Sequence, residues 1–271
     1  MARTRFVPGL RVGEGFSILI HGFPNVGKTH LMGDMLRTEA ARGPVCYLNT
    51  VGEDGDAATG GMFQDEIGEN LETMKDLREW IAETRKKPIQ ALGLDSVRLL
   101  MNFALYEIVG EVRMPDAKKD GERSKAMWGQ LRFNLETIFL SLKQTARYVF
   151  CTCPSDKEGA DVGGMVTPDL FGKLARGSAY WFDFVGALTA TVIGTGKVER
   201  KLKLAPSLNY ITKQRLATPI IDDIVIPVGG GGWASLKTQI EKGSSALRCY
   251  KDTSDNHTQK GGHRGSTDKY D

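Results

Sequence analysis

The stretch Gly22-Phe-Pro-Asn-Val-Gly-Lys-Thr29 fits the phosphate-binding pattern G-x-x-x-x-G-K-[ST] at every position. The apolar run Phe16–Ile20 before it predicts a buried strand. After it, apolar residues recur at helical spacing from Leu31 to Ala40, and Gly43-Pro44 ends the pattern. A chance match in a glycine-rich turn is the alternative, but this flanking context disfavours it. We therefore predict a phosphate-binding loop, or P-loop, on the first strand of an α/β fold.

The residue types of this loop predict how it binds a nucleoside triphosphate, which we expect to be ATP with Mg²⁺. Gly22 and Gly27 allow backbone angles that other residues avoid, so that main-chain amides can point at phosphate oxygens. Lys28 brings a positive charge to the β and γ phosphates, and the Thr29 hydroxyl is expected to ligate Mg²⁺. The residues predicted to contact the nucleotide are Gly22, Phe23, Pro24, Asn25, Val26, Gly27, Lys28, Thr29 and His30.

A second metal-binding side chain is predicted at Asp95, which ends the run Ile89-Gln-Ala-Leu-Gly-Leu-Asp95. A carboxylate at the carboxyl end of a central strand next to the P-loop reaches the Mg²⁺ shell in P-loop enzymes. The alternative is that Asp95 caps the helix that follows it. The metal role is favoured because P-loop chemistry requires such an acid.

Strand and helix patterns alternate over the first part of the chain. Apolar runs at Val45–Asn49 and Tyr148–Thr152 predict strands in addition to Phe16–Ile20 and Ile89–Asp95, and amphipathic helical patterns lie between them. This alternation favours parallel βαβ units. We therefore predict a central, mainly parallel sheet flanked by helices.

The pattern changes after Trp181. The runs Trp181–Ile193, Val198–Leu204 and Leu208–Thr212 predict strands with tight connections, which would extend the sheet in antiparallel fashion. A short helix is expected from Ala234 to Lys242. We predict one domain over residues 1–243 and a polar, disordered tail over residues 244–271.

The composition constrains the function only weakly. The 271 residues include 36 basic and 33 acidic side chains, a net charge of +3 that neither requires nor excludes nucleic acid. No run is long enough for a signal peptide or a membrane span, so a cytoplasmic protein is expected. Four cysteines lack zinc-site spacing and are expected to be buried or incidental thiols rather than structural metal ligands: Cys46, Cys151, Cys153 and Cys249.

From Phe16 to Arg215 the chain resembles the RecA-like ATPases, and more closely the small phage AAA-type nucleotide-binding proteins linked to single-strand annealing and recombination. The resemblance rests on the P-loop, the stretch Tyr47–Gly55, Leu94-Asp95-Ser96, two long loops, and the late Tyr210-Ile-Thr-Lys-Gln-Arg215 element. It implies a RecA-like fold, a homo-oligomeric ring or filament, and single-stranded DNA as partner. A recombination protein or a single-strand-binding protein is a further partner that it implies.

The resemblance also implies catalytic residues, with departures from the family pattern. Val51 stands where the family has a glutamate that polarises the attacking water, so Glu53 is the candidate base, with a solvated loop acid as the alternative. Where the family carries a polar γ-phosphate sensor at the end of the fourth strand, this chain has Thr152, Cys153 and Ser155. By resemblance, Lys213 and Arg215 would reach a neighbouring subunit's γ-phosphate; the alternative is a solvated edge-strand pair.

Two basic loops match the positions where RecA-like proteins hold single-stranded DNA. The segment Glu111–Lys125 and the segment Pro154–Arg176 combine cations with glycines, but they lack the strong interleaving of aromatic residues that base stacking uses. Merely solvated loops are the alternative. The predicted DNA contacts are Arg113, Lys118, Lys119, Arg123, Lys125, Lys157, Lys173 and Arg176.

Three functions follow from these features. The first is a DNA-dependent ATPase that acts in annealing or strand exchange. The second is a small-molecule or nucleotide kinase, in which Glu111–Lys125 would form a lid over the acceptor. The third is a nucleotide-gated binding module with little turnover, which the displaced Glu53 and the altered sensor positions suggest.

Overall fold

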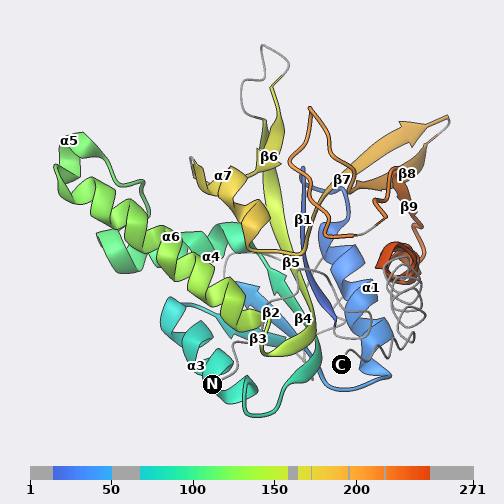
Figure 1. Ribbon diagram of the computed structural model, residues 1–271, viewed down its shortest axis with the longest axis horizontal. Coiled ribbons are helices and arrows are strands. Elements are labelled where there is room, and N and C mark those ends of the chain that lie inside the picture. Colours follow the sequence, from blue (N-terminus) through green and yellow to red (C-terminus); the bar gives the residue numbers. More distant parts are fainter. Residues whose placement is uncertain are drawn as a thin grey trace, which may run out of the picture.

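The computed structural model describes residues 15–50, 68–157, 164–171, 173–194, 196–216 and 218–244. Within these residues nine strands form one sheet, in the order β3-β2-β4-β5-β1-β7-β8-β9, with β6 paired to β5 (Figure 1). The strands are β1 (Phe16–Gly22), β2 (Val45–Thr50), β3 (Gly68–Leu71), β4 (Ile89–Asp95), β5 (Ala146–Lys157), β6 (Val166–Pro168), β7 (Phe184–Ile193), β8 (Lys197–Lys203) and β9 (Ile224–Ile226).

The centre of the sheet is parallel, as predicted. β1 runs parallel to β5 on one side, with Ile18 opposite Phe150, and to β7 on the other, with Ile18 opposite Phe184. β4 and β2 continue the parallel part beyond β5. We expected the strand that ends at Asp95 to lie next to the P-loop. In the structure β5 lies between that strand and the P-loop strand.

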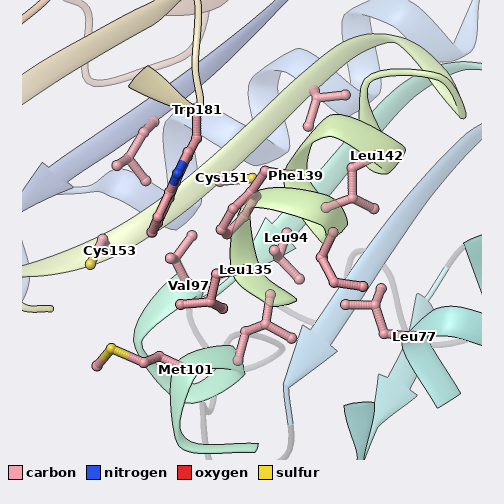
Figure 2. Packing of buried hydrophobic residues seen from close by; sticks show 14 of the residues in the cluster. Leu77, Leu94, Val97, Met101, Leu135, Phe139, Leu142, Cys151, Cys153 and Trp181 are labelled. Carbon is pink, nitrogen blue, oxygen red and sulfur yellow. The ribbon is translucent and has the colours of Figure 1, made fainter. Parts of the chain in front are cut away.

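Helices cover both faces of the sheet. The helices α1 (Lys28–Ala40) and residues 232–244 pack on one face, and α3 (Met74–Thr84), α4 (Val97–Val109) and α6 (Arg123–Leu142) pack on the other (Figure 1). Alternate residues of each strand serve the two cores: Ala91 packs with the α1 layer, whereas Leu92 and Leu94 pack with the α4 and α6 layer. Figure 2 shows this second core, where Leu94, Leu135 and Phe139 meet.

Local signals explain where several helices begin and end. A capping box between Thr73 and Asp76 starts α3. Gly110, with a φ of 81°, ends α4 in the left-handed conformation that favours glycine. Gly93 on β4 lets α1 approach the sheet closely, because an added Cβ would lie 2.8 Å from the Met32 sulfur.

The two segments predicted as loops contain more regular structure than expected. α5 (Ala117–Asp120) lies within the first, and α6 already begins at Arg123, inside the same segment. In the second, β5 continues to Lys157 and β6 pairs with its end, with Asp156 opposite Thr167. The short helix α7 (Lys173–Gly177) and the 3-10 turn Ser178–Tyr180 follow.

The antiparallel extension is confirmed for β7 and β8, β9 adds a strand that was not predicted, and one predicted strand is wrong. β7 pairs with β8 from Ala187 opposite Lys203 to Ile193 opposite Lys197. The segment Leu208–Thr212 is not a strand; its Tyr210 makes only an isolated bridge to Val166. Its alternating pattern was misleading because no neighbouring strand offers it a continuous ladder.

The last described helix, residues 232–244, is fastened to α1 by buried polar contacts. Asp34 accepts a hydrogen bond from the Trp233 backbone amide at 2.8 Å, and Glu39 accepts from the Trp233 indole at 2.9 Å and from Lys237 at 2.7 Å. Burial would raise the pKa of Glu39, but the bonds from Lys237, Trp233 and Gln90 lower it to about 2. The end of the described chain is thereby coupled to the helix that carries the P-loop.

Candidate nucleotide-binding site

The P-loop spans the connection between β1 and α1, in the strand–turn–helix context predicted. Gly27 precedes α1 with a φ of 97°, and the helix start has no hydrogen bond from a capping side chain. An added Cβ on Gly22 would lie 2.6 Å from the Leu188 carbonyl oxygen, so this position has no room for a side chain. Amides at an uncapped helix N-terminus favour an anionic ligand, and the backbone geometry therefore fits phosphate.

The Lys28 ammonium group lies along the inside of the loop. It donates hydrogen bonds to the carbonyl oxygens of Gly22 at 2.9 Å and Phe23 at 3.1 Å. Carbonyl oxygens are weaker acceptors for a cation than phosphate oxygens. We expect Lys28 to exchange them for the phosphates of a bound nucleotide.

Thr29 of α1 and Asp95 of β4 lie in contact, although β4 is not a neighbour of β1, the strand that precedes the P-loop. The Thr29 hydroxyl donates a hydrogen bond to one oxygen of the Asp95 carboxylate at 2.7 Å, and the Thr152 hydroxyl on β5 donates to the other oxygen. Asp95 is buried, with 4% of its surface exposed. A hydroxyl and a carboxylate are oxygen ligands of the kind that Mg²⁺ prefers, so these residues fit the predicted metal.

The alternative role of Asp95 as a helix cap is wrong. Ser96 is the N-terminal cap position of α4, and its own side chain makes no capping hydrogen bond. The end of β4 is instead fixed by Thr50 of β2, whose hydroxyl donates to the Asp95 carbonyl oxygen at 2.8 Å and accepts from the Ser96 amide at 2.9 Å. These contacts orient the Asp95 carboxylate toward the P-loop.

The residues at the sensor positions have structural contacts. Thr152 bonds to Asp95, Cys153 is fully buried, and the Ser155 hydroxyl lies 2.8 Å from Nδ1 of His21. Nε2 of His21 lies 2.8 Å from the carbonyl oxygen of Ile211. His21 immediately precedes the P-loop, and the sequence analysis did not single it out.

Burial determines the charge state of the groups behind the P-loop. It lowers the pKa of His21 to about 4, the hydrogen bond to Ile211 opposes this shift, and the positive charge of Lys28 adds to it. His21 is therefore neutral near pH 7 and leaves the positive charge of the loop to Lys28. The described cysteines are buried free thiols, and burial raises the pKa of Cys46 to about 12.

The candidate base Glu53 lies outside the described residues, as do Val51 and Cys249. Asn49 of β2 donates its side-chain amide to Asn70 of β3 at 3.2 Å. The role of Glu53 stays a prediction.

Lys213 and Arg215 lie near each other beside Asp183, outside any strand and at the opposite end of β1 from their own P-loop. Arg215 pairs with Asp183 at 3.3 Å, and Asp183 also accepts from the hydroxyl of Ser17 at 2.7 Å. Lys213 donates to the carbonyl oxygens of Phe182, at 2.8 Å, and Ala179. Burial lowers the pKa of Lys213 to about 8, and the nearby cation Arg215 adds to the shift. Their action on a neighbouring subunit stays a prediction.

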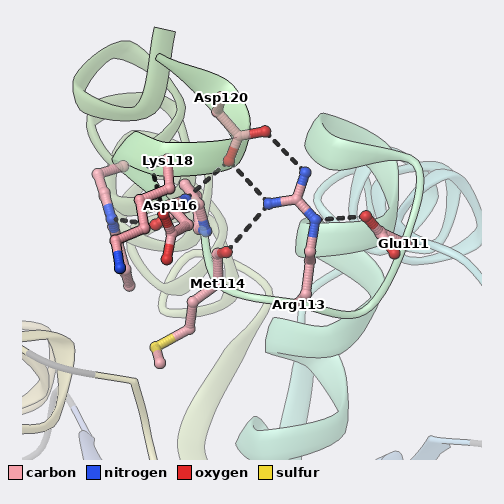
Figure 3. Close-up of polar contacts among 8 residues, drawn as sticks. Glu111, Arg113, Met114, Asp116, Lys118 and Asp120 are labelled. Atoms are coloured by element: carbon pink, nitrogen blue, oxygen red, sulfur yellow. Dashed lines mark hydrogen bonds and ion pairs between the residues drawn. The ribbon is translucent and has the colours of Figure 1, made fainter. Parts of the chain in front are cut away.

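Arg113 has a structural role within the first basic segment. Its guanidinium pairs with Asp120 at 2.7 Å and with Glu111, and it donates to the Met114 carbonyl oxygen at 3.2 Å (Figure 3). These bonds connect the end of α4 to α5. The guanidinium is therefore engaged within the segment instead of being presented to a ligand.

The other predicted DNA contacts are distributed over two surfaces. Lys118 and Lys119 on α5, and Arg123 and Lys125 at the start of α6, are exposed. Lys173 and Arg176 are exposed on α7, and Lys157 is the last residue of β5. The structure thus groups four cations on the α5–α6 tip and two on α7.

Arg200 on β8 is a further residue at the P-loop that the sequence analysis missed. An added Cβ on Gly27 would lie 3.1 Å from its Nε and Cζ atoms. No motif marks it, because Glu199-Arg200-Lys201 reads as an ordinary charged strand segment.

Among the described residues, no helix combines the length and apolarity that crossing a bilayer requires.

Comparison with other proteins gives the family. None of the curated proteins compared with the chain matches it. Residues 14–216 match the family model described as AAA domain, which covers more than half of the 271 residues. The chain therefore belongs to the AAA domain family.

Proposed function

We propose that this AAA-domain protein binds ATP with Mg²⁺, hydrolyses it, and uses the cycle to act on single-stranded DNA in annealing or recombination of the phage type. At the coarser level, family membership gives it a nucleotide-binding domain of the P-loop ATPase type. The observation that carries the proposal is the contact of Thr29 with the buried Asp95 beneath the uncapped start of α1. It supports a site in which separate protein groups bind the triphosphate and the metal ion.

The residues of this site would divide the work of hydrolysis as follows. Backbone amides of the P-loop and Lys28 bind and orient the phosphates, and Thr29 and Asp95 hold the metal ion. Bound Mg²⁺ supplies a positive charge that neutralises the phosphate oxygens. Glu53 is proposed to accept the proton of the attacking water.

The DNA part of the proposal rests on exposed cations. Lys118, Lys119, Arg123 and Lys125 gather on the α5–α6 tip, while the ion pairs of Arg113 keep that tip folded. Such clusters bind phosphate backbones in a salt-dependent way. A ring or filament of identical subunits would align these tips along one DNA strand and bring Arg215 of one copy toward the next. We place this activity in the cytoplasm, where a recombination partner would also act.

The test is ATP hydrolysis with and without single-stranded DNA at several salt concentrations. We expect stimulation by DNA that weakens as salt rises. A Lys28→Ala variant should lose nucleotide binding, and Glu53→Gln should keep binding while turnover falls. Hydrolysis that DNA leaves unchanged, together with no salt-dependent DNA binding, would contradict the DNA part while leaving the nucleotide site intact.

A binding module with little turnover is the second candidate. It is favoured by the engagement of Thr152 with Asp95 and of Ser155 with His21, which leaves the sensor positions occupied by structural contacts. Tight ATP binding with negligible hydrolysis, unchanged in Glu53→Gln, would support it. The kinase alternative has less support, because the ion pairs of Arg113 hold the proposed lid segment in place. Phosphate transfer to an acceptor other than water would support it.

A further inference from the structure

Arg200 extends from β8 toward the P-loop on the face of the sheet that α1 covers. Its neighbour two residues on, Leu202, is fully buried in the core shared with α1. Nε, Cζ and Nη1 of Arg200 would lie 3.1 to 3.3 Å from a Cβ built on Gly27. The guanidinium group therefore lies directly against the last glycine of the P-loop.

The guanidinium lacks an acceptor within the described chain. Its Nε atom is buried and has no hydrogen-bond partner among the described residues. Neighbouring cations on the same strand are paired: Lys201 lies 2.7 Å from Glu199, and Lys203 lies 2.6 Å from Asp223. Buried donors in folded proteins are nearly always hydrogen-bonded, so an unsatisfied charged donor at a phosphate-binding loop points to an anionic ligand.

One carboxylate lines the pocket beside Arg200, and it already accepts a hydrogen bond from another residue. Asp34 lines the same small pocket as Gly27, His30 and Arg200, but its carboxylate accepts from the Trp233 backbone amide at 2.8 Å. That amide bond fixes the carboxylate at the start of the 232–244 helix. Nε of Arg200 bonds to neither oxygen of Asp34, so we expect its acceptor to come from the ligand.

The strand order indicates which part of a nucleotide Arg200 meets. Asp95 ends β4 and Thr152 lies on β5, both on one side of β1, whereas Arg200 lies on β8, beyond β7 on the other side. The metal end of the site is thus on the β4–β5 side. Arg200 lines a pocket with Gly27 and His30, on the other side of β1 from Asp95 and Thr152.

We propose that Arg200 is a phosphate-binding residue supplied in cis, which donates to an oxygen of the α or β phosphate of the bound nucleotide. The proposal rests on the proposed nucleotide site and adds a residue to it. A contact at the α or β phosphate is present with ATP and with ADP. Arg200 would therefore increase affinity for both, in contrast to a group that senses the γ-phosphate.

The test compares Arg200→Ala with Lys201→Ala, a matched control that removes the adjacent cation from the opposite face of the strand. Isothermal calorimetry in Mg²⁺ measures the binding of ATP, ADP and inorganic tripolyphosphate. We expect Arg200→Ala to weaken all three by about tenfold or more and Lys201→Ala to change none of them more than about twofold. Arg200→Lys should recover part of the loss.

Unfolding without nucleotide separates binding from a structural role. Because Arg200 has no partner in the described chain, Arg200→Ala should not lower the urea midpoint of the nucleotide-free protein. Unchanged binding of all three ligands in Arg200→Ala would overturn the inference. Loss of ATP and ADP binding with tripolyphosphate unaffected would also overturn it, because Arg200 would then bind the nucleoside. If the wild-type protein and Lys28→Ala gave equally little heat, the nucleotide site itself would be rejected instead.

Discussion

The hydroxyl of Thr29 donates a hydrogen bond of 2.7 Å to the carboxylate of Asp95, across 66 residues of sequence. The two side chains come from the start of α1 and the end of β4. In the sheet, β5 separates β4 from β1, the strand that leads into α1. Because parallel strands end at one edge of the sheet, the carboxylate still reaches the P-loop helix. This contact brings together the two side chains predicted to hold Mg²⁺.

Replacing Asp95 by Asn should remove metal-dependent turnover. The amide keeps the size of the side chain but loses the negative charge that attracts Mg²⁺. We expect hydrolysis to fall by about a hundredfold or more and the Mg²⁺ concentration needed for half-maximal activity to rise. Asp223→Asn, which alters an exposed carboxylate paired with Lys203, is the control. Equal activity of Asp95→Asn and wild type over a magnesium titration would refute the metal role.

Protonation of His21 should destabilise the protein in mild acid. Burial lowers its pKa to about 4, below the unfolded value of 6.5, so the unfolded chain binds the proton more readily between these pH values. Its contribution is complete above pH 6.5 and is lost as the pH falls toward 4, by an amount on the order of 3 kcal/mol. Urea denaturation across this range measures the loss. His21→Gln should flatten the curve in this window, and an equally steep curve for the variant would assign the effect to other groups.

The buried pair of Glu39 and Lys237 should carry much of the attachment of the 232–244 helix. Glu39→Ala leaves Lys237 and the Trp233 indole without their acceptor, at a cost of about 3–5 kcal/mol of unfolding free energy. Glu79→Ala removes an exposed carboxylate that lies 3.6 Å from Lys75 and should change stability by less than about 1 kcal/mol. Chemical denaturation compares the two. Similar losses would show that the pair contributes little.

The low pKa of Glu39 predicts a second, more acidic transition. The folded pKa of about 2 lies below the unfolded value of 4.5, so the stabilisation is present above pH 4.5 and is lost as the pH falls toward 2. Tryptophan fluorescence during acid titration reports it, because Trp233 contacts Glu39. Trp233→Phe should remove the local signal, which identifies its source. A signal that stays constant from pH 4.5 to 2 would contradict the assignment.

Charge removal on the α5–α6 tip should weaken binding to single-stranded DNA. Replacing Lys118, Lys119, Arg123 and Lys125 with Ala should lower affinity and reduce the salt slope by about 0.7 for each phosphate that the variant no longer neutralises. The double variant Lys86→Ala with Lys87→Ala is the control, since these exposed cations lie just before the amino end of β4 and not on α5 or α6. Fluorescence anisotropy at several salt concentrations measures both. Equal slopes for the two variants would move the DNA site elsewhere.

Some predictions failed for identifiable physical reasons. The segment from Leu208 to Thr212 has a strand-like pattern, but only isolated bridges form there, at Tyr210 and at the following Lys213. The polar stretch after Glu111 was predicted as an open loop, yet the ion pairs of Arg113 fold it around α5. Hydrophobic periodicity does not report whether a partner strand is available or whether charged side chains find each other.

The sequence by itself determined the P-loop, because its eight residues are contiguous and the strand and helix around them carry their own periodicity. It also marked Asp95 as the acid at a strand end. Only the tertiary structure decided that β5 lies between β1 and β4, that Thr152 bonds to Asp95, that Arg200 lies against Gly27, and that Lys213 and Arg215 lie beside Asp183. Those relations depend on strand order and register, which join residues far apart in sequence through packing that no local pattern encodes.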